Sequence, residues 1–330
     1  MLGGRINENG KLVNLPRDES GYQTDVLARL AEDAIRRNSR GSQPFFLWLT
    51  PHVPHNGGPA DPDDPAGTRT TRPPARYRDR FASQPLPMPP SFNEADVSDK
   101  PVGIRNRALL SAQKIAGLRE AYQQALEANL GVDDAVKSVV DTLRSTGELD
   151  NTLIAFTSDN GFFYGEHRVP AGKVLLYEPS IRVPLVVRGP GIPKGVHRKQ
   201  LAANVDLAPT FVQLAKAKAG RVMDGRSLVP LFRSGSAGAN RDLLLEDGPA
   251  GGNRNPRQYV AVRTPRYLYA EYANGEHELY DLATDPNELN SRHGDPALAS
   301  VRERLARILA RLRTCAGPSC RSTGDLVSRP

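Results

Sequence analysis

Apolar residues recur every three or four positions in several stretches of the chain, and this spacing predicts amphipathic helices. In residues 24–37, for example, Val26, Leu30 and Ala34 would lie on one face of a helix. The predicted helices cover residues 24–37, 105–130, 132–146, 204–217 and 296–313. Short apolar runs bounded by turn residues instead predict buried strands at residues 45–49, 153–156 and 183–187.

After about residue 235 the pattern changes to short strands separated by turn residues. These strands are predicted at residues 259–262, 267–272 and 278–282, which is typical of an antiparallel sheet. We therefore predict an α/β fold with two domains. Residues 1–235 would form a mixed, mainly parallel sheet flanked by helices. Residues 236–330 would form an antiparallel subdomain closed by the terminal helix.

Composition and charge narrow the possible partners. The 330 residues are 38% hydrophobic and 25% charged, as is typical of a globular protein. The net charge of +7 is spread over interleaved acids and bases, which predicts no nucleic-acid partner. No apolar run approaches the roughly 18 residues that a membrane helix needs, so we expect no membrane partner. The residues after Met1 lack the pattern of a signal peptide, which predicts a cytoplasmic location for the chain as written.

Residues 153–173 hold the strongest candidate chemistry. The predicted strand at 153–156 runs into Ser158-Asp159-Asn160-Gly161, and Lys173 follows. Ligands of α/β sheets gather beyond the carboxyl ends of strands, where Asp159 and Asn160 would offer two oxygen ligands to a hard divalent cation. Lys173 would add a point charge for an anionic group. The alternative is a simple turn, because Asn and Gly are common turn residues.

Longer stretches carry a resemblance to a known family. SDNGFFYGEHR followed by GKVLLYEPSIRVPLVVRGPGIPKG resembles the sulfatase family of the alkaline phosphatase superfamily. PFFLWLTPHVPH is similar to the strand-and-histidine element of that family, and AVRTPRYLYAEY with GEHELYDLATDPNEL is similar to its tail. These matches cover nearly the whole chain, and they are closest to bacterial arylsulfatases and N-acetylglucosamine-6-sulfatase-like members.

The resemblance implies hydrolysis of a sulfate monoester carried by a sulfated small molecule or glycan. Family members attack the sulfur with a formylglycine hydrate and hold the sulfate with calcium and basic residues. By motif match, Asp159 and Asn160 would be calcium ligands, and His55 and Lys173 would be catalytic and bind the sulfate. His167 would contact the substrate, although a purely structural histidine fits its position equally well.

Two elements of the family do not occur in the sequence. Sulfatases carry a nucleophile motif of Cys or Ser followed by x-Pro-x-Arg, and neither Cys315 nor Cys320 fits it. The Asp-Asp pair that supplies further calcium ligands has no match either. We therefore predict a truncated sulfatase with part of an active site, weak calcium binding and a complementary N-terminal fragment as a candidate partner. The resemblance to usually exported enzymes favours a disulfide between the two cysteines in the parent enzyme, and the alternative for this chain, which has no signal sequence as written, is a pair of inert thiols.

Three alternatives remain open. The chain could be a catalytically inactive fragment or scaffold. It could also hydrolyse phosphoesters or phosphonates, because a metal and a lysine do not by themselves separate sulfate from phosphate. Finally, Ser111 fits the S-x-x-K motif and Ser158 the S-D-N motif of penicillin-recognising serine hydrolases, but their K-T-G motif is absent.

Overall fold

The computed structural model describes residues 2–57, 61, 64–233, 241–247 and 258–321. The chain forms two compact units. The first unit comprises Met1–Met88 and Leu110–Ile154, and the second comprises Pro89–Leu109 and Ala155–Pro330. The predicted domain boundary at residue 235 lies outside the described residues, so it stays a prediction.

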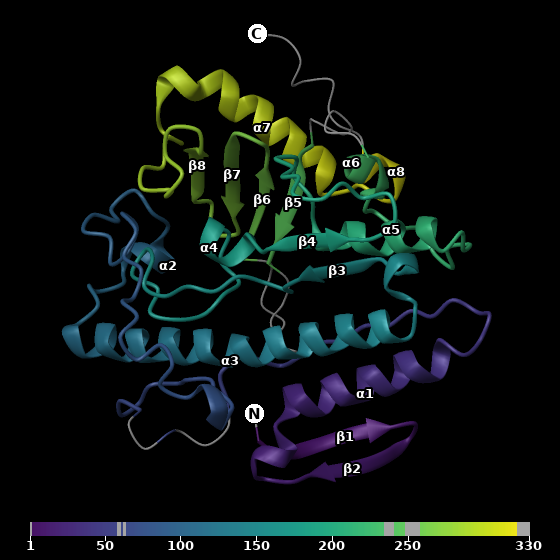
Figure 1. Cartoon of the computed structure of the whole chain (residues 1–330). Coiled ribbons are helices and arrows are strands. Elements are labelled where there is room, and N and C mark those ends of the chain that lie inside the picture. The colour runs from purple at the N-terminus through teal and green to yellow at the C-terminus, as the bar shows by residue number, and fades with distance from the viewer. Residues whose placement is uncertain (1, 58–60, 62–63, 234–240, 248–257, 322–330) are drawn as a thin grey trace. The chain divides into compact units, whose positions relative to one another are not determined.

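The first unit is built on two helices and a hairpin (Figure 1). Helix α1 (Gln23–Asn38) packs against α3 (Ala112–Ser145), and strands β1 (Gly4–Glu8) and β2 (Lys11–Leu15) pair antiparallel. Of the side chains that the sequence pattern places inside, Val26 is buried, whereas Leu30 and Ala34 are partly buried. The amphipathic spacing therefore predicted this helix correctly and its inner face in part.

Helix α3 is one continuous helix where the sequence pattern predicted two. Its 34 residues contain no proline, and Gly131, between the two predicted helices, costs a helix interior only about 1 kcal/mol. The helix begins after Ser111, whose hydroxyl accepts the backbone N–H of Lys114. Ser111 is thus an N-cap, a role that explains its presence without any nucleophilic chemistry.

The strand predicted at residues 45–49 does not form. A strand requires hydrogen bonds to a neighbouring strand, and none of the described sheets includes this segment. Phe46 and Trp48 are instead 69% and 80% exposed. The prediction of a buried strand here is therefore wrong, because the described part of the chain holds no strand that pairs with this segment.

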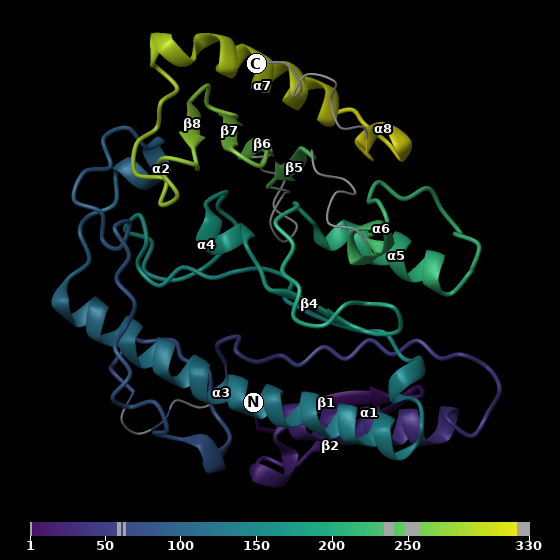
Figure 2. The same ribbon diagram turned by 45° about the horizontal axis from the view of Figure 1, so that its top comes forward.

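The second unit contains a four-stranded antiparallel sheet in the order β5-β6-β7-β8. The strands are β5 (Leu243–Glu246), β6 (Tyr259–Arg263), β7 (Tyr267–Tyr272) and β8 (His277–Asp281). Helix α7 (Ala299–Leu312) covers one face of this sheet, as Figure 2 shows. The predicted antiparallel sheet and terminal helix are therefore confirmed.

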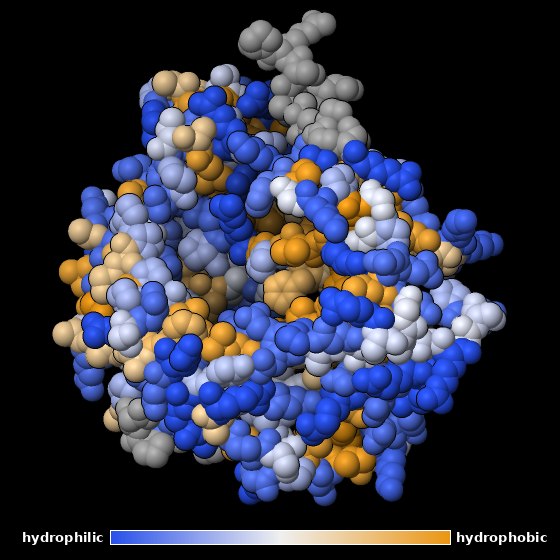
Figure 3. Space-filling model, viewed as in Figure 1, coloured by the Kyte–Doolittle hydropathy of each residue, from blue (hydrophilic) through white to orange (hydrophobic). Residues whose placement is uncertain are grey.

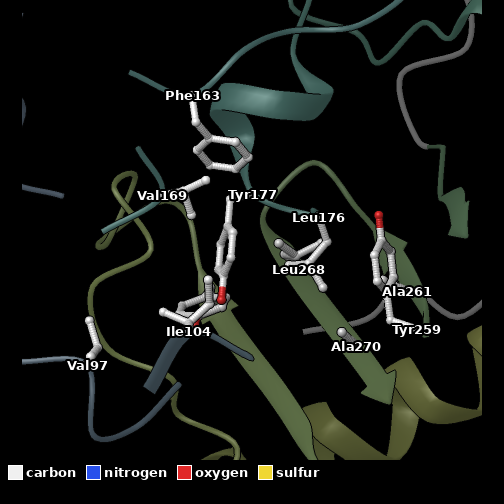
Figure 4. Close-up of a cluster of buried hydrophobic side chains, with 11 residues drawn as sticks. Val97, Ile104, Phe163, Val169, Leu176, Tyr177, Tyr259, Ala261, Leu268 and Ala270 are labelled. Atoms are coloured by element: carbon white, nitrogen blue, oxygen red, sulfur yellow. The ribbon is translucent and has the colours of Figure 1, made fainter. Parts of the chain in front are cut away.

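Alternate residues of these strands face two different cores, because side chains in a strand alternate between its faces. Val262 and Leu279 pack with Leu305 and Ile308 of α7. On the other face, Leu268 and Tyr280 pack with Tyr177 and other side chains of residues 97–177 (Figure 4). This second core anchors the loops that carry the candidate chemistry.

Two further strands, β3 (Ile154–Thr157) and β4 (Leu185–Arg188), pair with each other and point in opposite directions in Figure 1. Of the predicted mainly parallel sheet, the described residues hold this pair alone. Phe156, Leu185 and Val186 are 42%, 38% and 62% exposed. Apolar atoms accordingly gather at the surface over these two strands in Figure 3.

The remaining helices are short. They are α2 (Val102–Arg105), α4 (Glu178–Ile181), α5 (Leu207–Leu214), α6 (Val229–Arg233) and α8 (Pro318–Arg321). A disulfide joins Cys315 to Cys320, the pairing that the resemblance favoured. Among the helices that the structure describes, none combines the length and apolarity needed to cross a membrane. The location of the protein stays a prediction.

Candidate functional site

The loop after β3 carries the candidate ligands, and hydrogen bonds to its backbone carbonyl oxygens hold it in place. The amide of Asn204 donates to the carbonyl oxygens of Ser158 and Asp159, at 3.2 and 3.1 Å. The Ser158 hydroxyl donates to the carbonyl oxygen of Asn160 at 2.9 Å. These contacts occupy main-chain groups, so the exposed carboxylate of Asp159 is left pointing to solvent rather than into a core.

Gly161 fixes the position of this loop against α4. Its backbone N–H donates to the carbonyl oxygen of Ser180 at 2.8 Å. A Cβ at position 161 would lie 2.1 Å from the carbonyl oxygen of Pro179, a distance that no side chain could adopt. The glycine of the SDNG stretch is therefore required by close backbone approach, and that approach places Asn160 beside the start of α4.

A second loop brings Lys173 to the same place. Phe163 and Gly172 form an isolated antiparallel β-bridge, in which the backbone N–H of Phe163 donates to the carbonyl oxygen of Gly172 at 2.9 Å. This bridge folds the intervening residues into a closed loop. Nζ of Lys173 then donates to Oδ1 of Asn160 at 2.9 Å. Asn160 and Lys173, thirteen positions apart in sequence, are thus neighbours in the structure.

This arrangement puts one positive charge next to the amide oxygen of Asn160. Lys173 is half-buried, while Asp159 is exposed. An ammonium group can donate to an anion from any of its three hydrogens, and only one of them is used by Asn160. The geometry therefore leaves Lys173 able to donate to a further acceptor, and its binding of an anion stays a prediction.

The described residues do not complete a calcium site. Asp159 and Asn160 offer two side-chain oxygens, whereas calcium takes about six to eight ligands. In the part of the chain that the structure describes, no three or more His, Cys, Asp or Glu side chains are placed to hold a metal. Oδ1 of Asn160 also accepts the Lys173 ammonium, which would repel a cation at that oxygen.

His55 belongs to the first unit, whereas Asn160 and Lys173 belong to the second. Its side chain is exposed, its Nδ1 lies 2.8 Å from the carbonyl oxygen of Asn56, and its ring centroid lies 4.8 Å from that of His52. The structure thus brings together Asn160 and Lys173 of the predicted site residues. The catalytic role of His55 stays a prediction.

His167 is completely buried. Its Nδ1 lies 2.7 Å from Oε2 of Glu94, and its ring lies 4.3 Å from that of Tyr177. Oε1 of the same glutamate lies 3.3 Å from Nζ of Lys100, which is also buried. An imidazole enclosed in this way cannot contact a solvent-borne substrate without rearrangement. The geometry favours the structural alternative for His167, and its predicted contact with substrate remains a prediction.

The sequence reasoning missed a cavity in the second unit. Its lining includes α4 residues Glu178 and Arg182 together with Glu288. Glu178 and Glu288 are 110 positions apart, and the backbone N–H of Glu178 donates to Oε2 of Glu288 at 2.9 Å. No spacing pattern could reveal such a contact, although the quoted tail segment GEHELYDLATDPNEL contains Glu288.

Family comparison decides what kind of protein contains this site. A family model described as Sulfatase matches residues 5–217. That range is more than half of the 330 residues. The chain belongs to the sulfatase family. A second model, described as the C-terminal part of N-sulphoglucosamine sulphohydrolase, matches residues 165–315 of the chain.

Curated relatives agree with this assignment. The sulfatase chain is 34% identical to an arylsulfatase of Volvox carteri, covering 91% of this chain and 52% of the relative. It is 32% identical to an N-acetylglucosamine-6-sulfatase of Capra hircus, covering 97% of this chain and 60% of the relative. The chain thus spans about half to three fifths of the length of these relatives.

Solved structures confirm the fold. A protein in complex with its substrate, D-glucosamine-2-N,6-O-disulfate, matches with a TM-score of 0.78 and 22% identity, covering 98% of this chain and 74% of that one. The phosphonate monoester hydrolase of Agrobacterium radiobacter matches with a TM-score of 0.54 and 28% identity, covering 62% of this chain and 43% of that one. The α/β class predicted from the sequence is therefore that of the sulfatase fold.

Proposed function

We propose that this chain contributes the sulfate-binding part of a sulfuric ester hydrolase. The observation that carries the proposal is the 2.9 Å contact between Nζ of Lys173 and Oδ1 of Asn160, next to Asp159. This contact joins two of the three residues that match the family motif, and the third, Asp159, precedes Asn160 in the sequence and is exposed. An ammonium that contacts an amide oxygen, in a loop that also has an exposed carboxylate, is suited to an anion that shares its site with a cation.

Each residue then has a defined role. Lys173 binds a sulfuryl oxygen and stabilises the charge that develops there as the ester bond breaks. Asp159 and Asn160 orient that group and supply two of the oxygens that would hold calcium. His55 gives a proton to the departing alcohol, a contribution that is typically worth about 10²–10⁴-fold in rate. Calcium, when bound, would neutralise charge on the sulfate.

The nucleophile is proposed to come from outside these residues. No Cys or Ser in the 330-residue sequence begins the x-Pro-x-Arg motif that formylglycine formation requires. A complementary fragment or segment that carries this motif would complete the site. The natural substrate is proposed to be a sulfated glycan, because one relative is named an N-acetylglucosamine-6-sulfatase and one matching structure holds a disulfated glucosamine.

A phosphonate or phosphoester substrate is the second candidate. The similarity to the phosphonate monoester hydrolase of Agrobacterium radiobacter, at 28% identity, favours it. An ammonium binds either anion, so Lys173 does not distinguish them. The two candidates differ in the charge and shape of the preferred ligand, and this difference can be measured directly.

The test compares anion binding with turnover. Binding of inorganic sulfate, phosphate and phenylphosphonate to the full chain would be measured by isothermal titration calorimetry. Lys173→Met is expected to weaken sulfate binding about tenfold, whereas Lys194→Met, at an exposed lysine elsewhere, should leave it unchanged. Sulfate binding that is equal in wild type and Lys173→Met would overturn the proposal, and tighter binding of phenylphosphonate would favour the second candidate.

Turnover separates an enzyme from a scaffold. Hydrolysis of 4-nitrophenyl sulfate would be followed with and without calcium, and Lys173→Met provides the background rate. Sulfate binding without turnover above that background is the expected result for a chain that lacks its nucleophile. Turnover well above the background would instead show that this chain alone is a complete catalyst.

A further inference from the structure

The disulfide between Cys315 and Cys320 closes a short loop after the end of α7, because the two cysteines are five positions apart. Cys315 packs against the core between α7 and the four-stranded sheet, so this end of the loop is fixed to the fold. Both cysteines are only partly buried, so a small thiol in solution can reach their sulfur atoms. Exposed disulfides exchange with thiols more readily than enclosed ones do.

The loop closed by the disulfide holds a segment that is distant in the sequence, residues 222–226, which we call the clasped segment. The backbone N–H of Gly317, inside the loop, donates to Oδ1 of Asp224 at 2.7 Å. The guanidinium of Arg321, next to Cys320, donates to the carbonyl oxygen of Met223. The disulfide therefore constrains both groups that contact the clasped segment.

The clasped segment packs on a turn that contains Asp206. A Cβ at Gly225 would lie 1.9 Å from the carbonyl oxygen of Val205, so the two backbones are in direct contact. The backbone N–H of Arg226 donates to Oδ1 of Asp206 at 2.9 Å, and Asp206 is fully buried. A movement of the clasped segment would therefore disturb this turn.

The same turn supports the loop of the SDNG stretch. Asn204, two positions before Asp206, donates its side-chain amide to the carbonyl oxygens of Ser158 and Asp159 at 3.2 and 3.1 Å. A continuous series of contacts thus runs from the disulfide through the clasped segment and Asn204 to the SDNG loop. All of these residues belong to the second unit. Packed and hydrogen-bonded contacts of this kind can carry a change from one site to another.

We propose that the bond between Cys315 and Cys320 is a site of thiol–disulfide exchange, and that its reduction by a dithiol loosens the SDNG loop. One thiolate of the dithiol attacks one sulfur of the bond, and the other cysteine sulfur leaves as a thiolate. The second thiol of the reductant then attacks the mixed disulfide and closes a cyclic disulfide. The dithiol loses two electrons and two protons, and the chain gains two thiols.

Reduction loosens the clasped segment because the bond restricts the open conformations of the loop that holds it. For a closed loop of this size, the chain-entropy argument predicts that losing the bond favours the open conformations about thirtyfold. The effect should stay local, since Leu305, Ile308 and Leu309 of α7 remain packed against the sheet.

Hydrogen–deuterium exchange of the full chain, measured by mass spectrometry before and after reduction with dithiothreitol, tests this inference. Labelling with iodoacetamide should find no thiol before reduction and both cysteines after it. Reduction should speed exchange about thirtyfold in peptides that cover the clasped segment and about threefold in those that cover the SDNG loop. Peptides from β6 and β7 should not change. The double variant Cys315→Ser, Cys320→Ser should exchange as the reduced wild type does, with or without dithiothreitol.

Three further variants test the individual links. Asp224→Ala removes the acceptor of the Gly317 N–H and should speed exchange of the clasped segment without reduction. Asp295→Ala also removes the acceptor of a backbone N–H in the second unit, but away from the clasped segment, and is the matched control that should leave this exchange unchanged. Asn204→Ala, at an exposed position, should abolish the effect of reduction on the SDNG loop and keep its effect on the clasped segment.

Several results would overturn the inference. They are thiols that react before reduction, equal exchange of the clasped segment in the oxidised and reduced protein, and faster exchange there that does not reach the SDNG loop. A rise in all peptides alike would show that reduction unfolds the whole unit, which also contradicts a local effect.

Sulfate binding gives a separate measurement, and this step rests on the proposed function. Reduction should weaken calorimetrically measured sulfate binding about threefold, because the SDNG loop carries Asn160, the partner of Lys173. Sulfate binding that is present and unchanged by reduction would overturn the effect on the site. If the oxidised chain binds no sulfate, the proposed function fails, whereas the exchange measurements still decide whether the disulfide controls the loop.

Discussion

The hydroxyl of Tyr177 donates to Oε1 of Glu278 at 2.8 Å inside the second unit, while the ring of the same tyrosine lies 4.3 Å from that of His167. Glu278 is fully buried, and the hydroxyls of Tyr272 and Tyr280 donate to it as well, each at 2.5 Å. One tyrosine therefore links the loop of the SDNG stretch to the four-stranded sheet through a buried polar network.

Glu278 should make the stability of the protein depend on pH. Burial raises the pKa of its carboxyl above the ordinary value of 4.5, so the folded state holds the proton more tightly than the unfolded state does. The stabilisation that this provides is fully present below about pH 4.5 and is lost as the pH rises through the folded-state pKa. Glu278→Gln stays neutral throughout, and so the free energy of unfolding of the wild type should fall relative to that of Glu278→Gln as the pH rises.

Urea unfolding of the two proteins at a series of pH values from 4 upward measures this difference. Its slope should not exceed about 1.4 kcal/mol per pH unit, the value for a single proton. Glu271→Gln, in the same sheet but less buried, serves as the control. A difference between wild type and Glu278→Gln that is independent of pH, or that rises with pH, would show that the carboxyl is not held neutral.

His167 should matter for stability rather than for ligand binding. Replacing it with Ala removes a completely buried ring and leaves the carboxylate of Glu94 without one of its partners. A cavity together with a weakened buried ion pair should lower the free energy of unfolding by about 3 kcal/mol. His197→Ala, at an exposed histidine, should change it by less than about 0.5 kcal/mol. Denaturant unfolding measures the stability of both variants. A stable His167→Ala that no longer binds sulfate would instead support the predicted contact of His167 with the substrate.

Calcium should bind to this chain weakly. Two side-chain oxygens satisfy only part of the coordination shell, and the Lys173 ammonium already occupies Oδ1 of Asn160. Calorimetric titration should therefore give a dissociation constant above about 1 mM, and Lys173→Met should strengthen binding several-fold by removing a like charge. Micromolar binding by the wild type that disappears in Asp159→Ala would contradict this expectation.

The sequence predicted those parts of the fold that depend on local patterns. The apolar spacing of residues 24–37 marks helix α1, and the strands β6 and β7 begin at the predicted residues because turn residues bound them. The contact between Asn160 and Lys173 was anticipated only because both match one family motif. Spacing alone would have read the same residues as a turn and a solvated lysine.

Features that depend on residues far apart in the chain could not be predicted from local sequence patterns. Residues 45–49 have the composition of a strand, but a strand exists only where another strand pairs with it. Burial of His167 depends on Glu94, which is 73 positions away, and the cavity depends on a contact of Glu288 with the backbone of Glu178. Such long-range contacts leave no period in the sequence.

The apolar surface over β3 and β4 should cause the isolated chain to self-associate (Figure 3). Val186 is 62% exposed, as is Leu12 on the hairpin of the first unit, so the two positions form a matched pair. Val186 has exposed Phe156 and Leu185 on the same strand pair, and none of the described strands adds to β3 or β4 at their outer edges. A contiguous apolar patch with open strand edges favours pairing with another chain, and a lysine on the patch opposes it.

In sedimentation-velocity or light-scattering measurements, Val186→Lys should therefore shift the protein toward the monomer, whereas Leu12→Lys should not. Species with exposed strand edges associate at about 100 μM. A wild-type chain that stays monomeric at this concentration would show that this surface does not drive self-association.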